Sequence, residues 1–142
     1  MRTVLLVDDE HAIVDALQGI LEDEGYRVLT AAHGREALAR LEEAGPGEGR
    51  PHVALLDLMM PIMGGRELLQ RLRGSQAWAR LPVLMMSAVP REVLERQEGG
   101  ALACDAFLEK PFDLGTLLAT LDRLAGPAKR RPAAKPTRGG KK

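Results

Sequence analysis

The sequence predicts an α/β fold in which helices cover both faces of a parallel sheet. Five short apolar segments alternate along the chain with segments whose apolar residues recur every three or four positions. Continuous apolar runs are typical of parallel strands that are buried on both faces, and each helix between two strands returns the chain across the sheet. No internal repeat competes with this interpretation. With 142 residues and 45% apolar content, the chain is long enough for one domain with its own core.

Four of the five predicted strands stop at a polar side chain. Asp8 and Asp9 follow the first strand, and Asp57 ends the third. The fourth stops at Ser87 and the fifth at Lys110. Because ligands of open parallel sheets bind at the carboxyl ends of the strands, these side chains are expected to form one site for a divalent cation and a phosphoryl group. The predicted strands cover residues 4–7, 26–31, 53–57, 82–86 and 106–109.

Apolar periodicity marks the five predicted helices, and glycine or proline marks several of their ends. The first helix carries an apolar stripe from Ala12 to Leu21 and ends near Gly25. The third follows Gly64 and Gly65, and Asp113 has the residue type that caps the start of the last helix. The predicted helices cover residues 12 to about 25, 35–44, the segment after Gly65 through Leu72, 90 to about 97, and 113–124.

The formal net charge of zero conceals an acidic body and a basic tail. Seven of the 20 basic residues lie in positions 126–142, beyond the last acidic residue, Asp122, so residues 1–125 carry −7 and the tail +7. The Pro, Ala, Gly and Lys content of the tail cannot bury enough apolar surface to offset the entropy lost on ordering. The tail at 126–142 is therefore predicted to be disordered, and the domain to cover residues 1–125.

Cysteine usage and hydropathy indicate a cytoplasmic protein. The single cysteine, Cys104, cannot form an intramolecular disulfide, which favours a reducing compartment. The chain has neither the apolar region of a signal peptide nor an apolar run long enough to span a bilayer. Membrane insertion is not expected.

Four motifs together resemble the receiver domain of two-component response regulators. They are VLLVDDE at 4–10, DLMMPIMGG at 57–65, SA at 87–88 and FLEKPF at 107–112, each about one strand-helix-strand interval from the next. Any one alone is a weak match, and the joint spacing gives the resemblance its specificity. It covers residues 1 to about 125 and implies the flavodoxin-like, doubly wound sheet with strand order 2-1-3-4-5, as in chemotaxis receivers.

The resemblance implies a role for each residue at the strand ends. Asp57 matches the phosphoacceptor, which takes a phosphoryl group from a phosphohistidine. Mg²⁺ would be held by Asp9, Asp57 and the backbone carbonyl of Met59, with Asp8 acting mainly through water. Lys110 would place a positive charge beside a phosphoryl oxygen.

The resemblance also implies a switch. Ser87 would donate a hydroxyl hydrogen bond to the phosphoryl group, and Phe107 would turn inward in response. That motion would change the face formed by the fourth helix, fifth strand and fifth helix. The peptide bond between Lys110 and Pro111 is expected to be cis, as is usual in this family. Ile62 and Gly64 depart from the pattern, since the family often has acidic residues there.

These residues point to a signalling module that catalyses only its own phosphorylation and dephosphorylation. After residue 125 no helix-turn-helix or enzyme module is expected, so the chain is interpreted as a stand-alone receiver. It would take its phosphoryl group from a histidine kinase or a histidine phosphotransfer protein and control an output protein that the sequence does not identify. Two alternatives stay open: a relay intermediate that passes the group to a histidine phosphotransfer protein, and a regulator that contacts nucleic acid through its seven tail cations. The second is not favoured, because the tail lacks aromatic residues.

Overall fold

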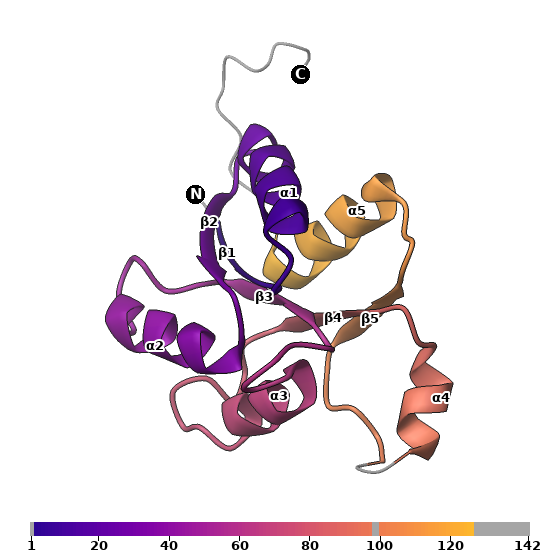
Figure 1. The fold of residues 1–142 in the computed structure, drawn as a ribbon. Helices are drawn as coiled ribbons and strands as arrows, with labels where there is room; N and C mark the ends of the chain where they lie inside the picture. The colour runs from indigo at the N-terminus through magenta and orange to yellow at the C-terminus, as the bar shows by residue number, and fades with distance from the viewer. Residues whose placement is uncertain (1, 98–99, 127–142) are drawn as a thin grey trace.

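A single parallel sheet of five strands runs through the centre of the protein (Figure 1). The computed structural model describes residues 2–97 and 100–126. The strand order is β2-β1-β3-β4-β5, and every neighbouring pair is parallel, which confirms the predicted topology. The strands are β1 (Thr3–Val7), β2 (Arg27–Ala31), β3 (Val53–Asp57), β4 (Val83–Ser87) and β5 (Ala106–Glu109).

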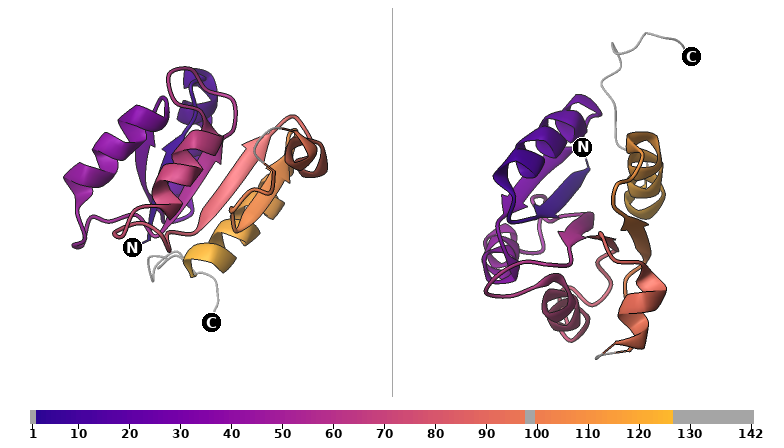
Figure 2. Two further views of the ribbon diagram at one scale, coloured as in Figure 1. Left: turned by 90° about the horizontal axis from the view of Figure 1, so that it is seen from below. Right: turned by 45° about the vertical axis from the view of Figure 1, so that its right-hand side comes forward.

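Helices cover both faces of the sheet, as the sequence predicts. α1 and α5 lie on one face, and α2, α3 and α4 lie on the other, as Figures 1 and 2 show. Asp113 caps α5 as expected, since its carboxylate accepts a hydrogen bond of 3.0 Å from the backbone N–H of Thr116. The helices are α1 (His11–Asp23), α2 (Gly34–Ala44), α3 (Gly65–Arg73), α4 (Arg91–Arg96) and α5 (Leu114–Ala125).

The core consists of two apolar layers, one on each face of the sheet. Successive side chains of a strand point to opposite faces, so Val4 and Leu6 of β1 pack with α1 and α5, while Leu5 and Val7 pack with α2 and α3. All four are fully buried. Burial on both faces explains why the strands are continuous apolar runs in the sequence. The packing of both layers holds the sheet in place, and the polar groups lie at the strand ends.

Several boundaries differ from the sequence prediction by a residue or two, and three of these differences concern the packing or the site. Tyr26 precedes β2 instead of starting it, because its backbone N–H donates to the carbonyl of Leu21 at 3.0 Å; its side chain is buried and its hydroxyl donates a hydrogen bond to Asp122 of α5. β4 extends one residue further than predicted, so Ser87 is its last residue. α4 is shorter than predicted, and Leu94 is its one buried residue.

Trp78 and Cys104 lie at the edge of the apolar core. Both are partly buried against the apolar layer under α2 and α3. The guanidinium of Arg50 lies over the Trp78 ring at 5.0 Å from its centroid. Burial raises the pKa of the Cys104 thiol, as expected for an inert side chain beside the core.

The predicted basic tail begins at Gly126, the last residue before positions 127–142, which lie outside the described residues. Its disorder and its contact with nucleic acid therefore stay predictions, as does the boundary of the domain at residue 125. Within residues 2–97 and 100–126, no helix is long and apolar enough to cross a membrane.

Candidate functional site

The polar residues at the strand ends gather at one edge of the sheet. Asp8 directly follows β1, Asp57 is the last residue of β3, and Ser87 is the last residue of β4. β1, β3 and β4 are neighbours in the sheet, so their carboxyl ends lie side by side. Lys110 follows β5 and joins this edge, because its backbone N–H donates a 2.7 Å hydrogen bond to the carbonyl oxygen of Ser87.

Three carboxylates meet at this edge. Asp8, Asp9 and Asp57 each bring one oxygen to within 4.8 Å of the others, and they are the one group of potential metal ligands among the described residues. Asp8 and Asp57 are buried, whereas Asp9 is exposed. Like charges this close, partly removed from water, repel one another unless a cation lies between or beside them.

Lys110 supplies one such cation. Its Nζ lies 3.0 Å from Asp57 Oδ1 and 3.7 Å from Asp8 Oδ2. Burial lowers the pKa of Lys110, but the hydrogen bond to Asp57 and the negative charges of Asp57 and Asp8 outweigh it and raise the pKa above its ordinary value. The amine therefore stays protonated at neutral pH. The Lys110–Pro111 peptide bond is cis, as the resemblance implies.

The surroundings of Asp57 disfavour its ionised form and raise its pKa. Burial raises its pKa, and the nearby charges of Asp8 and Asp9 raise it further, while the hydrogen bond and charge of Lys110 oppose the shift. The net direction is upward. A divalent cation among these oxygens would favour the anionic form that a nucleophile needs.

The donor set fits a hard divalent cation such as Mg²⁺. Asp8 Oδ1 accepts a hydrogen bond of 3.0 Å from the N–H of Glu10, but Asp8 Oδ2 is buried and has no hydrogen-bond partner among the described residues. A buried carboxylate oxygen without a hydrogen bond is destabilising unless a cation binds to it, and Lys110 Nζ, at 3.7 Å, is too far away to donate one. Carboxylate oxygens are the ligands that such ions prefer. The carbonyl of Met59 as a further ligand stays a prediction; the side chain of that residue is 70% exposed.

The turn after Asp57 is built by close packing. A Cβ at Gly65 would lie 2.5 Å from the carbonyl oxygen of Asp57, so only glycine lets α3 begin this near the strand end. The N–H of Gly65 donates to the carbonyl of Leu58 at 2.9 Å. Ile62 has φ 67°, a backbone conformation unusual for a β-branched residue, inside a tight turn in which the N–H of Met63 donates to the carbonyl of Pro61 at 2.7 Å.

The two predicted switch residues lie on adjacent strands. Ser87 is buried, and its Oγ accepts a 3.0 Å hydrogen bond from the N–H of Val89. Phe107 of β5 is partly buried against the apolar layer on the α2–α4 face and lies opposite Met85 of β4. Their coupled motion stays a prediction.

Comparison with known proteins identifies the family. The model of the response regulator receiver domain matches residues 4–122, which is most of the chain. The chain belongs to the response regulator receiver family. Its sheet order and its helices on both faces agree with that assignment.

Curated relatives of this receiver are transcriptional regulators. TrcR of Mycobacterium tuberculosis is 37% identical over 118 residues, which are 83% of this chain and 43% of that protein. PhoP of Bacillus subtilis, an alkaline phosphatase synthesis regulator, is 38% identical over 111 residues, or 78% of this chain and 43% of that one. The chain thus spans less than half the length of these two relatives.

Solved structures of receivers share the fold. The chemotaxis protein CheY4 of Vibrio cholerae is 39% identical and superposes with a TM-score of 0.76, covering 87% of this chain and 98% of that one. The response regulator TrrA of Thermotoga maritima, solved in complex with Mg²⁺ and BeF, is 27% identical with a TM-score of 0.73, covering 87% and 99% of the two chains.

An apolar groove lies beside the edge of the sheet that carries Asp57 and Lys110. It lies between α1 and α5 and has a volume of about 530 Å³. Lys110 lines this groove and its Nζ also lies 3.0 Å from Asp57 Oδ1, so this residue borders both the groove and the carboxylate site. Leu114, at the start of α5, is 44% exposed at its rim. The groove is also lined by Ile13, Ala16, Leu17, Ile20, Met86, Ala88, Pro111 and Phe112.

Proposed function

We propose that this receiver accepts a phosphoryl group on Asp57 from a phosphohistidine of a histidine kinase or a histidine phosphotransfer protein. The observation that carries the proposal is the position of Lys110 Nζ, 3.0 Å from Asp57 Oδ1, at the edge where Asp8 and Asp9 also gather. Lys110 is the one lysine in residues 1–125, so a solubilising surface charge does not explain its burial beside two carboxylates.

In the proposed reaction, a carboxylate oxygen of Asp57 attacks the phosphorus of the donor. The new P–O bond forms as the P–N bond to the imidazole breaks, and the electron pair of that bond returns to the imidazole nitrogen. Lys110 holds its ammonium next to the attacked centre and donates a hydrogen bond to a phosphoryl oxygen. Ser87, whose hydroxyl is on the neighbouring strand, donates to another.

A hard divalent cation, Mg²⁺ in this proposal, completes the charge balance. Asp8, Asp9 and Asp57 would hold it, with the carbonyl of Met59 as a further ligand. When bound, the ion offsets the repulsion between these carboxylates and the oxygens of the donor. The bare, buried Oδ2 of Asp8 supports this assignment.

The groove between α1 and α5 is the surface on which we place the phosphodonor. The donor histidine has to reach Asp57, and the groove opens directly beside Lys110. Its lining is apolar, which suits the apolar stripe of a helix in the donor domain. We therefore propose that the helix of the donor that carries the phosphohistidine docks in this groove.

Phosphorylation would then act on an output protein through the face formed by α4, β5 and α5. Ser87 ends β4 and Phe107 lies on β5, so both belong to the strands that connect the site to this face. Movement of Ser87 toward the phosphoryl group would leave space into which Phe107 turns. The resulting change of surface would select the partner.

A labelling experiment tests the proposal. The purified protein is incubated with acetyl phosphate and Mg²⁺, and incorporated phosphate is counted by intact mass. We expect one phosphate per chain, no incorporation in Asp57→Asn, and none in excess chelator. Asp15→Asn is the matched control, because it removes an exposed carboxylate from α1 and should label normally. Equal labelling of Asp57→Asn and the control would rule out the assignment.

A second arm separates the two roles of a receiver. The labelled protein is mixed with a purified histidine phosphotransfer domain. Loss of the label together with its appearance on that domain would favour the relay role over the binding switch. Retention of the label, with a phosphorylation-dependent partner captured in parallel, would favour the switch.

A further inference from the structure

α4 and its connection to β5 are held mainly by side-chain hydrogen bonds. α4 has six residues, and Leu94 is the one among them that is buried. In the described part of the following connection, residues 100–105, Leu102 is the buried side chain. A segment with so little apolar contact depends on its polar links for its position.

Open space separates α4 and the connection from α3. A cleft of about 1030 Å³ lies between α3 and α4, lined by residues that include Glu67, Gln70, Leu94 and Gln97. A second cavity of about 230 Å³ lies between α3 and residues 101–103. Leu94 and Leu102 share one apolar layer with the buried leucines of α3, and the rest of the gap between these segments is open.

Two arginines of α3 cross this space, and Arg66 is the one that reaches α4. Arg66 of α3 donates from Nη1 to the carbonyl of Gly100 and from Nη2 to the carbonyl of Leu94, both at 3.1 Å. The first carbonyl is in the connection, and the second is in the last turn of α4. The planar guanidinium of Arg66 is thus hydrogen-bonded both to α4 and to the connection that follows α4.

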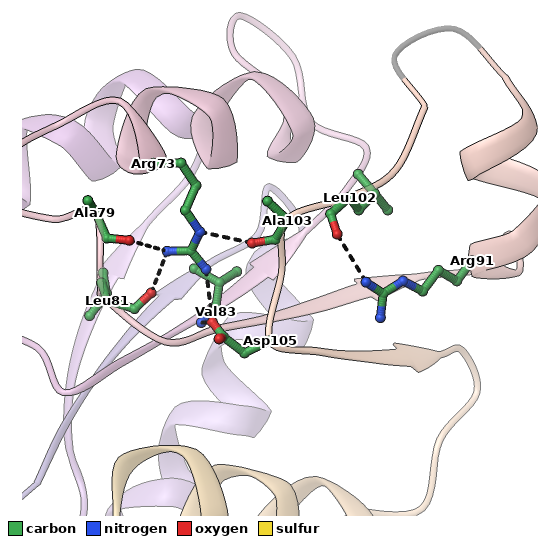
Figure 3. Close-up of polar contacts among 8 residues, drawn as sticks. All are labelled: Arg73, Ala79, Leu81, Val83, Arg91, Leu102, Ala103 and Asp105. Carbon is green, nitrogen blue, oxygen red and sulfur yellow. Dashed lines mark hydrogen bonds and ion pairs between the residues drawn. The ribbon is translucent and has the colours of Figure 1, made fainter.

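The far end of the connection is fixed separately, as Figure 3 shows. Arg73 donates to the carbonyls of Ala103 at 2.8 Å and Leu81 at 2.7 Å and pairs with Asp105 at 2.8 Å. The same Asp105 oxygen accepts from the N–H of Val83 at 2.8 Å, which ties the start of β5 to β4. This anchor lies at the opposite end of the strands from Asp57, so Arg66 is the link nearer to the phosphoacceptor.

Arg66 also follows the residue that touches the phosphoacceptor strand most closely. Gly65 leaves no room for a Cβ beside the carbonyl of Asp57 and hydrogen-bonds to Leu58. A backbone shift at Asp57 therefore displaces the first turn of α3, and with it the base of the Arg66 side chain. We propose that Arg66 is a positioning residue that passes such a shift from Asp57 to α4, along a route separate from Ser87 and Phe107.

This relay rests on the proposed phosphorylation of Asp57, and its test uses beryllofluoride with Mg²⁺ as a stable substitute for the phosphoryl group. Hydrogen–deuterium exchange of the α4 peptide, residues 91–97, is measured with and without the probe in wild type, Arg66→Gln and Arg71→Gln. Arg71 is the matched control, because it lies on the same helix and pairs with Glu67 on the surface. If the Arg66→Gln protein does not fold, the Arg66→Lys protein is measured in its place, because lysine keeps a positively charged hydrogen-bond donor at this position.

We expect the probe to change exchange in 91–97 by roughly tenfold in wild type and Arg71→Gln, and by less than about twofold in Arg66→Gln. The peptide that contains Asp57 should still be protected by the probe in all three. A merely structural role for Arg66 would raise exchange with and without the probe and leave the tenfold response intact, which would overturn the relay. Absence of any response at Asp57 in wild type would overturn the proposed function as well, so the two failures are distinguishable.

Discussion

Replacement of Gly65 by alanine should destabilise the receiver and displace Asp57 at the same time. The added Cβ would lie 2.5 Å from the carbonyl oxygen of Asp57 and 2.9 Å from the Cα of Leu58, whereas ordinary contact begins near 3.4 Å. Both neighbours are backbone atoms in or beside a central strand, so neither can rotate away. The strand end or α3 has to shift by most of an ångström.

The expected change in the free energy of unfolding combines two destabilising effects with one stabilising effect. Overpacking of this kind costs about 1–3 kcal/mol, and a weakened hydrogen bond from Gly65 to Leu58 adds about 1 kcal/mol. Alanine recovers about 1 kcal/mol of helix propensity. We expect a net loss of about 2 kcal/mol in the free energy of unfolding, or about 8 °C in Tm.

Gly19→Ala provides the matched control, because it makes the same chemical change in the middle of α1. No heavy atom lies within 4 Å of the added Cβ there. We expect this variant to gain about 1 kcal/mol from helix propensity alone. Urea unfolding followed by circular dichroism measures both variants. A Gly65→Ala protein as stable as wild type would refute the close approach of α3 to Asp57.

Three further substitutions test the site and its surroundings. Ile62→Asn should stabilise the protein by about 1 kcal/mol in urea unfolding, because asparagine tolerates a positive φ, here 67°, better than a β-branched residue does; a loss of stability would contradict this. His52 accepts a 3.0 Å hydrogen bond at Nδ1 from the N–H of Thr3, and burial, with the charges of Arg2 and Arg50, lowers its pKa. The stability that neutral His52 contributes is therefore fully present above the pKa of the unfolded state, about 6.5, and is lost as the pH falls toward the lowered pKa of the folded state. The difference in unfolding free energy between wild type and His52→Ala should shrink from about pH 7.5 to about pH 5, which bracket that value. A difference that does not change with pH would refute the role of His52 as a neutral acceptor. Lys110→Ala should stay folded by circular dichroism yet label with acetyl phosphate about a hundredfold more slowly; unchanged labelling would remove Lys110 from the site.

The sheet and its helices could be predicted because their signals are local and repeated. Each strand is an apolar run, and each helix shows a period of three to four residues, so the order of elements follows from the printed sequence. The convergence of Asp8, Asp57 and Lys110 was predictable for a related reason. Parallel strands bring their carboxyl ends to one edge, and each of these residues stands at the end of a run.

Strand boundaries were less predictable because side-chain packing decides them. Tyr26 has strong strand propensity, yet it lies just before β2. Its backbone N–H is bonded to Leu21, and its hydroxyl is bonded to Asp122 on α5, which is distant in sequence. Ser87 continues β4 because it pairs with Glu109 of β5 and its carbonyl accepts the N–H of Lys110, the residue that follows β5. Neither partner can be identified from local periodicity.

The arginine links could not be predicted at all. Arg66 and Arg73 look like ordinary charges on the polar face of an amphipathic helix, and their acceptors are backbone carbonyls that any residue type provides. The close approach at Gly65 leaves only a weak signal in the sequence, a pair of glycines that predicts the start of a helix. A single sequence does not show which glycine lacks room for a Cβ.

The central claim, that Asp57 is the phosphoacceptor, is tested most directly by trapping the aspartyl phosphate. The receiver is incubated with acetyl phosphate and Mg²⁺ and then treated with borohydride, which reduces an acyl phosphate to the alcohol and so converts the labelled aspartate to homoserine. Peptide sequencing by mass spectrometry then locates the homoserine. We predict homoserine at position 57 and unmodified aspartate at positions 8 and 9. Homoserine at Asp8 or Asp9, with Asp57 unmodified, would contradict the assignment.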